Sequence, residues 1–351
     1  MKRKAITVLI AALIAVLFLR EAAAWSRFDW KSFGQASRKI RIAPVLFAIA
    51  LIYLGFFLRA LRWQVLLRPL KRARFLPLVR ATIIGFAGLA MLGRPAELVR
   101  PYLIAREEGL STSSQLAIWT LERIFDLAAA AFLVLTGVLA APELRKLPYM
   151  GQLGRAAWFA AFVAVLVAAA LLLLWRFRSR FSMYELEGTR GGGLFSSFRR
   201  GIDSFSEALK GLRSPAAFAS AAALSLVMWL AIAIAYFEVI RACPYPLATM
   251  SFPAVLLLMG FSLAGSLVQL PGGGAAQLMV IAVLSNVFSV PVELALTCGI
   301  LLWLATYMAP VPVGLMLLRK EQFSLRSIAR ASTEVNAAKS ASDLPRRALS
   351  Q

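Results

Sequence analysis

The chain has 351 residues, 60% of them hydrophobic, and a mean hydropathy of +0.75. Several unbroken apolar runs are long enough to cross a bilayer, which takes about 20 residues each, so we expect an all-α polytopic membrane protein. A transmembrane β-barrel is excluded because its segments alternate in hydropathy over roughly ten residues.

The residue types also exclude several kinds of catalytic site. The net charge is +22, but the basic residues cluster just outside apolar runs, so we expect contacts with anionic lipid and none with nucleic acid. The chain contains no His, and Cys243 and Cys298 stand apart without CxxC spacing, which argues against a histidine base, a zinc site or a disulfide framework. Since no GxxxxGK[ST] loop occurs, we expect no ATPase activity and no cofactor.

The N-terminal part predicts two spans. Residues 1–19 carry three basic residues and then an apolar run, which we interpret as a retained first helix, although the alanines at 22–24 resemble a signal-peptidase site. The second span covers residues 42–58. Six basic residues follow it with no acid between them, and they predict a cytoplasmic segment: Arg59, Arg62, Arg68, Lys71, Arg72 and Arg74.

Two basic segments lie among and after the remaining apolar runs. A linker at residues 176–214 is basic and is expected in the cytoplasm, and residues 319–351 predict a disordered basic cytoplasmic tail after a transmembrane domain of residues 1–318. Pro310 and Pro312 are expected to kink the last span. The apolar runs are residues 75–92, 115–141, 156–174, 216–237, 252–270, 275–290 and 294–318.

Counting charges on each side of the membrane predicts two re-entrant hairpins. If residues 75–92 crossed completely, one strongly basic segment would lie outside, so we expect this run to return through residues 96–106. A second re-entrant hairpin is expected at residues 252–290. This gives about six full spans and two hairpins, with both termini cytoplasmic. Residues 42–141 and 216–318 then form an inverted repeat in which each half is span, hairpin, span, and such interrupted helices are typical of transporters.

Six charged residues within this apolar chain are candidate site residues. Glu97 and Arg100 are three residues apart and Glu122 and Asp126 are four apart, so each pair shares a helix face. Ionisable side chains at membrane depth usually face the bundle interior and mark a ligand path. A packing network of salt bridges, or an interfacial helix around Glu97, is the alternative. The six are Arg94, Glu97, Arg100, Glu122, Arg123 and Asp126.

Three motifs together resemble the flippase-like family, which is the transmembrane region of lysylphosphatidylglycerol synthases. They are GRPAELVR at residues 93–100, LERIFDL at 121–127 and QLPGGG at 269–274. The family often has an acidic residue soon after the glycines, where this chain has Gln277, which offers polarity without charge. A plain turn is the alternative for the glycine-rich stretch. The second hairpin thereby adds to the candidate site Gln269, Pro271, Gly272, Gly273, Gly274 and Gln277.

The resemblance implies a translocase in the cell inner (plasma) membrane that moves lipids between leaflets. Its lipid partners would be anionic, aminoacylated or glycosylated, and a separately encoded synthase or glycosyltransferase is a further expected partner. Only some thirty residues follow residue 318, so lysyl transfer is not expected. An integral-membrane transferase with Glu122 or Asp126 as its base, and a non-catalytic scaffold, are the alternatives.

Overall fold

The structure is a computed structural model that describes residues 29–68, 70–141, 215–267 and 272–320. These residues form α-helices, short 3-10 helices and a π-helix, and no β-strand occurs among them. Within these ranges, five helical segments are long and apolar enough to cross a membrane: Ile42–Leu67, Phe75–Leu92, Thr112–Ala140, Pro215–Ala242 and Val292–Arg319. The prediction of an all-α polytopic membrane protein is confirmed.

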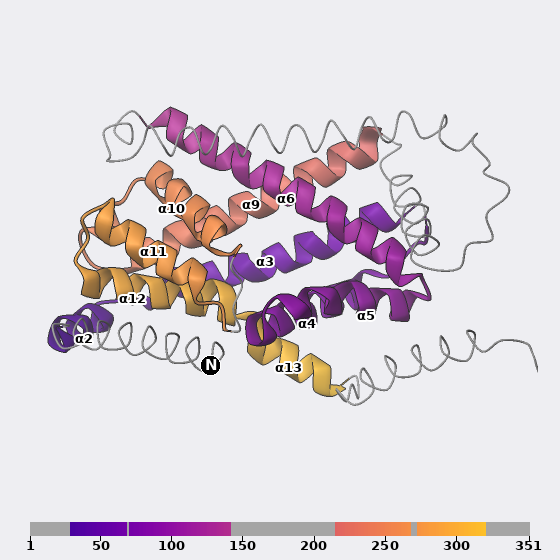
Figure 1. The fold of residues 1–351 in the computed structure, drawn as a ribbon, viewed down its shortest axis with the longest axis horizontal. Coiled ribbons are helices and arrows are strands. Elements are labelled where there is room, and N and C mark those ends of the chain that lie inside the picture. The colour runs from indigo at the N-terminus through magenta and orange to yellow at the C-terminus, as the bar shows by residue number, and fades with distance from the viewer. Residues whose placement is uncertain (1–28, 69, 142–214, 268–271, 321–351) are drawn as a thin grey trace, which may run out of the picture.

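Figure 1 shows the described elements, coloured in chain order, with α3, α6 and α9 running lengthwise through the molecule. The predicted apolar runs that fall within the described residues agree with the observed helices to within about five residues, except at the end of α3. The elements are α2 (Trp30–Arg38), α3 (Ile42–Leu67), α4 (Phe75–Leu92), η1 (Arg94–Leu98), α5 (Val99–Glu108), α6 (Thr112–Ala140), α9 (Pro215–Ala242), η4 (Leu247–Thr249), α10 (Phe252–Gly265), α11 (Ala275–Asn286), α12 (Val292–Leu302), η5 (Trp303–Met308) and α13 (Pro310–Lys320).

Helix α3 is longer than its apolar run. The predicted span ended at residue 58, but the helix continues to Leu67, and Arg59 and Arg62 lie inside it as buried residues. No glycine or proline interrupts this stretch, so the helical backbone can continue. The predicted end of the span at residue 58 is therefore wrong, because Arg59 and Arg62 lie within the helix and find acidic partners inside the bundle. The cytoplasmic side of the basic segment stays a prediction.

The three long helices α3, α6 and α9 form the frame of the molecule. Helices α3 and α9 pack against each other along much of their length, and α6 contacts α9 and α10. Helix α9 buries Ala221, Ala231 and Ala235, whose small side chains allow close approach of neighbouring helices. This frame leaves room on one side for the shorter helices.

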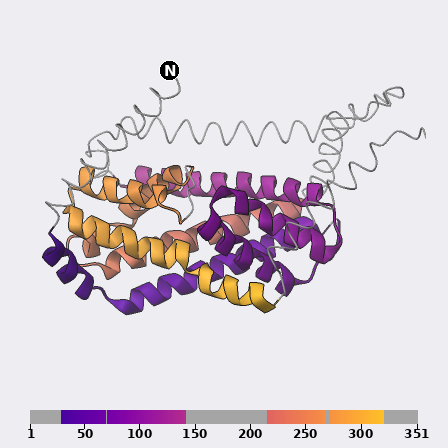
Figure 2. The ribbon, with the colours of Figure 1, turned by 60° about the horizontal axis from the view of Figure 1, so that its bottom comes forward.

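The shorter helices form two hairpins at opposite ends of that frame. The first runs from α4 through η1 to α5, and the second pairs α10 with α11. Figures 1 and 2 both show the α4/α5 pair on the right half of the long axis and the α10/α11 pair on the left half. Opposed hairpins are what the inverted repeat predicts, whereas their re-entry into the bilayer stays a prediction.

The tips of the two hairpins meet near the middle of the molecule. The backbone N–H of Gly272 donates to the carbonyl of Ala90 at 3.0 Å, and the indole of Trp303 donates to the carbonyl of Gly272 at 2.7 Å. Gly272, Gly273 and Gly274 have φ angles of 78°, 92° and 75°, a left-handed region that favours glycine. At Gly273, a Cβ atom would also lie 2.9 Å from the ring of Tyr307, so a larger residue would not fit.

Close helix contacts inside each hairpin depend on the absence of a side chain. A Cβ atom at Gly85 of α4 would lie 2.7 Å from the Cβ of Arg100 on α5. A Cβ atom at Gly265 of α10 would lie 2.9 Å from the carbonyl oxygen of Ala275 on α11. Both distances are shorter than ordinary packing permits, so these glycines set how closely the hairpin arms approach.

The last apolar run is interrupted, as its prolines predict. Helix α12 passes into the π-helix η5, and α13 begins at Pro310. Proline has no N–H to continue the helical hydrogen bonding, and π-helical turns commonly accompany such breaks. The interruption places Trp303 and Tyr307 beside the tips of both hairpins.

Several predicted segments lie outside the described residues. They are the first helix at residues 1–19, the span at 156–174, the linker at 176–214 and the tail beyond residue 320. Their predicted roles stay predictions. Helix α13 itself ends at Lys320, two residues into the predicted tail.

Candidate functional site

A cluster of arginines and carboxylates lies between α3, α5 and α6. Arg59 and Arg62 share one face of α3, and Glu122 and Asp126 share the facing side of α6. Arg62 bridges both acids, with Nη2 at 2.6 Å from Glu122 Oε1 and Nη1 at 2.8 Å from Asp126 Oδ1. Nη1 of Arg59 lies 2.9 Å from Asp126 Oδ2. We call Arg59, Arg62, Arg100, Glu122 and Asp126 the buried charge cluster.

Arg100 brings the first hairpin into this cluster. Its guanidinium pairs with Oε2 of Glu122 and lies 4.2 Å from the ring centroid of Trp63. Arg62 and Glu122 are 1% and 0% exposed, and Arg100 is 4% exposed. Breaking a buried pair leaves a charge without compensation, so these contacts hold the helices in one arrangement.

Neutral groups add hydrogen bonds to the cluster, whereas Nε of Arg62 and Nη1 of Arg100 are buried without a hydrogen-bond partner in the described ranges. Nη1 of Arg62 donates to Ser225 Oγ at 2.5 Å, and the indole of Trp229 donates to Asp126 Oδ1 at 3.2 Å. Both partners belong to α9, so three long helices contribute to one polar network. Buried ionised groups persist only with such partners.

Arg123 lies at the edge of the cluster and is half-exposed. Its Nη2 is 3.5 Å from Asp126 Oδ2 and 3.8 Å from Glu122 Oε2, and its side chain is 40% exposed. With Arg123, four guanidinium groups meet two carboxylates, an excess of two positive charges in the described structure. An anion beside Arg123 would balance part of this excess.

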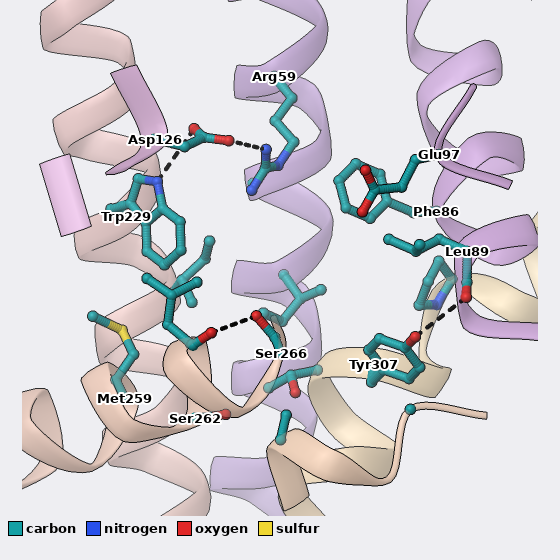
Figure 3. Close-up of a pocket in the computed structure, with 18 of the residues that line it drawn as sticks. Arg59, Phe86, Leu89, Glu97, Asp126, Trp229, Met259, Ser262, Ser266 and Tyr307 are labelled. Carbon is teal, nitrogen blue, oxygen red and sulfur yellow. Dashed lines mark hydrogen bonds and ion pairs between the residues drawn. The ribbon is translucent and has the colours of Figure 1, made fainter. Parts of the chain in front are cut away.

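A cavity of about 460 Å³ adjoins the cluster and extends to both hairpin tips. Figure 3 shows Arg59, Asp126 and Trp229 on one side of it and Glu97 near Phe86 on another. The lining is mostly apolar with a few polar groups, which is the usual composition of a binding pocket.

The cavity brings together six of the twelve predicted site residues, and they come from both hairpins and α6. Arg100 and Glu122 do not line it and lie buried behind its wall. Gly272 and Gly274 are the chain neighbours of Gly273, which lines the cavity. Gln269 and Pro271 lie outside the described residues. The six lining residues are Arg94, Glu97, Arg123, Asp126, Gly273 and Gln277.

The two charged residues of η1 have different surroundings. Nη2 of Arg94 donates to the carbonyl of Leu267 at 2.6 Å, which links the tip of the first hairpin to the second. The carboxylate of Glu97 lines the cavity with no ion-pair or hydrogen-bond partner in the described ranges. Glu97 is therefore available to a ligand.

Sequence reasoning missed two groups of cavity or cluster residues. Arg59 and Arg62 were assigned to a cytoplasmic basic segment after the span. Their spacing of three matches one helix face and could have been compared with the four-residue spacing of Glu122 and Asp126. Four hydroxyl residues that line the cavity could not be recognised as site residues from the sequence, because single Ser, Thr and Tyr residues are common in apolar helices. These are Tyr236, Ser262, Ser266 and Thr306.

The described residues offer no evident metal site. Among them, no group of three or more His, Cys, Asp and Glu side chains lies close enough to hold an ion. The acids of the buried charge cluster are already engaged by arginines.

Comparison with known proteins identifies the family. A search of curated proteins finds no significant match. The model of the lysylphosphatidylglycerol synthase transmembrane region matches residues 5–314, which includes all three motifs and every described helix up to α13. The chain thus belongs to the family of the lysylphosphatidylglycerol synthase transmembrane region.

Proposed function

We propose that this protein is a lipid translocase that moves a phospholipid, or another lipid with a polar headgroup, between membrane leaflets. The observation that carries the proposal is the cavity in which residues of both hairpin tips meet the edge of the buried charge cluster. Membership of a family named for lipid synthases supports a lipid as the partner.

A polar path lowers the barrier that a headgroup meets in hydrocarbon. Moving an unpaired charge into an apolar medium costs many kcal/mol in principle. Arg123 and Arg94 offer donors to a phosphate, and Glu97 offers an acceptor, all inside the same cavity. The acyl chains can stay in the surrounding lipid, so only the headgroup passes through the protein.

The opposed hairpins suit alternating access. Their tips meet through few contacts, such as the bond from Gly272 to Ala90 and that from Arg94 to Leu267. Small movements of either hairpin would open the cavity toward its own side, as in transporters with inverted repeats. We place the end with exposed Arg68, Arg72 and Arg74 in the cytoplasm, in a protein of the cell membrane with both termini inside.

Proteoliposomes test the proposal. Lipids labelled with a fluorophore on an acyl chain are reconstituted with the protein, and dithionite quenches only the outer leaflet. We expect fluorescence to fall beyond the half quenched in protein-free vesicles. Arg123→Gln should slow the exchange about tenfold, since a charge-assisted contact to phosphate is lost. Arg241→Gln is the matched control, because this exposed α9 residue lies outside the cavity lining.

The outcomes separate the proposed activity from its alternatives. Exchange equal to that of empty vesicles, with correctly folded protein, would reject the translocase. Formation of a modified lipid on adding an activated aminoacyl or glycosyl donor would indicate a transferase. Neither exchange nor product, with retained binding to a synthase, would indicate a scaffold.

A further inference from the structure

The cavity has two chemically different walls. The charged wall consists of Arg59, Arg94, Glu97, Arg123 and Asp126. The neutral wall consists of Tyr236, Ser262, Ser266, Gln277 and Thr306, from α9, α10, α11 and η5. Figure 3 shows Arg59 and Asp126 at one end of the cavity and Ser262 and Ser266 at the other. A headgroup that fills the cavity therefore meets both kinds of surface.

The neutral wall presents hydrogen-bond acceptors beside the donors of the Gln277 amide and of the Tyr236 and Ser262 hydroxyl groups, whose oxygens lie 3.0 Å apart. Ser266 Oγ donates to the carbonyl of Leu263 at 2.6 Å and Thr306 Oγ1 to that of Leu302 at 2.7 Å, so both oxygens can only accept a further bond. Oε1 of Gln277 is buried and has no partner in the described ranges. A buried acceptor without a partner is unfavourable, so this wall is suited to a ligand that supplies O–H or N–H donors.

The net charge of the cavity favours headgroups of one sign. The described lining carries three arginines and two carboxylates, and Arg62, Arg100 and Glu122 behind it add a further positive charge. A headgroup with net negative charge is attracted, whereas one with net positive charge is repelled at short range. Arg123, the half-exposed arginine, is the natural contact for the phosphate.

A hydroxyl group suits the neutral wall better than an ammonium group does. A hydroxyl needs only neutral acceptors, but a desolvated ammonium needs a carboxylate beside it. None of the five residues of the neutral wall is ionised at neutral pH. Glu97 is the lining carboxylate without a cationic partner among the described residues, and it lies on the charged wall.

We infer that the cavity selects a lipid of net negative charge whose phosphate carries an uncharged polyhydroxyl group, such as glycerol or a sugar, over a lipid with an amine. The inference rests on the proposed function and names its substrate class. Gln277 is then a specificity-determining residue, and the phosphate and the polyhydroxyl group contact opposite walls.

A panel of lipids with one labelled acyl chain and different headgroups tests the inference. We expect phosphatidylglycerol to exchange roughly tenfold faster than phosphatidylethanolamine and lysylphosphatidylglycerol, which carry amines. Phosphatidic acid, which has the phosphate but no glycerol headgroup, should also be slower. Equal or faster exchange of the amine lipids would overturn the inference.

Variants of Gln277 locate the selectivity. Gln277→Glu keeps the shape and adds a carboxylate to the neutral wall, so we expect the preference for phosphatidylglycerol over phosphatidylethanolamine to fall about tenfold. Ser285→Ala is the matched control, since Ser285 Oγ is also a buried unpartnered group of α11 but lies outside the lining. If Glu97→Gln alone abolished exchange of the amine lipids while Gln277→Glu changed nothing, Glu97 would bind an amine and the inference would be wrong.

A binding measurement tests the headgroup selectivity independently of transport. Trp119 and Trp229 line the cavity, so brominated lipids with the same headgroups should quench tryptophan fluorescence in detergent. Quenching strongest with phosphatidylglycerol, without any exchange in vesicles, would reject the translocase and keep the selectivity. Equal quenching by the amine lipid would reject the selectivity. Displacement by free glycerol phosphate at the lipid's own concentration would reject a lipid as the ligand.

Discussion

The buried charge cluster and the cavity lining use the same residue types in opposite ways. In the cluster, Glu122 contacts Arg62 and Arg100, and Asp126 contacts Arg59 and Arg62. At the cavity, Glu97 and Oε1 of Gln277 have no partner in the described ranges. Charge inside an apolar chain therefore does not by itself mark a binding residue, because the paired charges of the cluster fix the packing, whereas the unpaired polar groups that line the cavity are available to a ligand.

The strongest way to break this comparison is to remove a carboxylate from the cluster. Glu122→Gln leaves Arg62 and Arg100 buried with one carboxylate fewer, and we expect a loss of about 3–5 kcal/mol in the free energy of unfolding. Thermal unfolding in detergent measures it. Glu293→Gln, at the start of α12 and outside both regions, is the control. Equal stability of both variants would mean that the cluster does not hold the helices together.

A smaller loss is expected when the hairpin is forced away from the cluster. Gly85→Ala places a Cβ atom 2.7 Å from that of Arg100, so α4 and α5 must separate. Overpacking of this kind costs about 1–3 kcal/mol. Gly34→Ala is the matched control, because nothing lies within 4 Å of its Cβ position. Identical unfolding temperatures for the two variants would show that the close α4/α5 contact is dispensable.

The smallest effect on stability is expected at the cavity. Glu97→Gln removes a charge without a partner in the described ranges, so the free energy of unfolding should change by less than about 0.5 kcal/mol. Exchange of phosphatidylglycerol should persist, because the phosphate of this lipid contacts Arg123 and its hydroxyl groups contact the neutral wall. Loss of stability comparable to that of Glu122→Gln would place Glu97 with the structural charges.

The sequence predicted the membrane helices and the hairpin tips better than the pairing of charges. Apolar runs and the glycines at 272–274 depend on local backbone preferences, which a single sequence displays. The partners of Glu122 and Asp126 depend on how α3 packs against α6, about 60 residues away in the chain. A charge count assigned Arg59 and Arg62 to a basic segment beyond the end of the span, since it cannot distinguish such a segment from arginines that continue a helix.

The candidate site follows the same division. The motif residues Arg94, Glu97 and Arg123 lie at one cavity because α4, α5 and α6 are consecutive in the chain. The neutral wall combines α9, α10, α11 and η5, and its hydroxyl groups become recognisable only when these helices are assembled. Arg100 and Glu122 were predicted as translocation residues, and their burial away from the cavity favours a positioning role instead.

Filling the cavity tests the central claim most directly. Ser266→Trp places a large side chain in the lining without changing any charge, whereas Ala264→Trp adds the same group to an exposed position of α10. Dithionite quenching of acyl-labelled phosphatidylglycerol in proteoliposomes compares the two. We predict that Ser266→Trp lowers exchange to the level of protein-free vesicles and that Ala264→Trp leaves it unchanged. Undiminished exchange by a folded Ser266→Trp protein would contradict passage of the headgroup through this cavity.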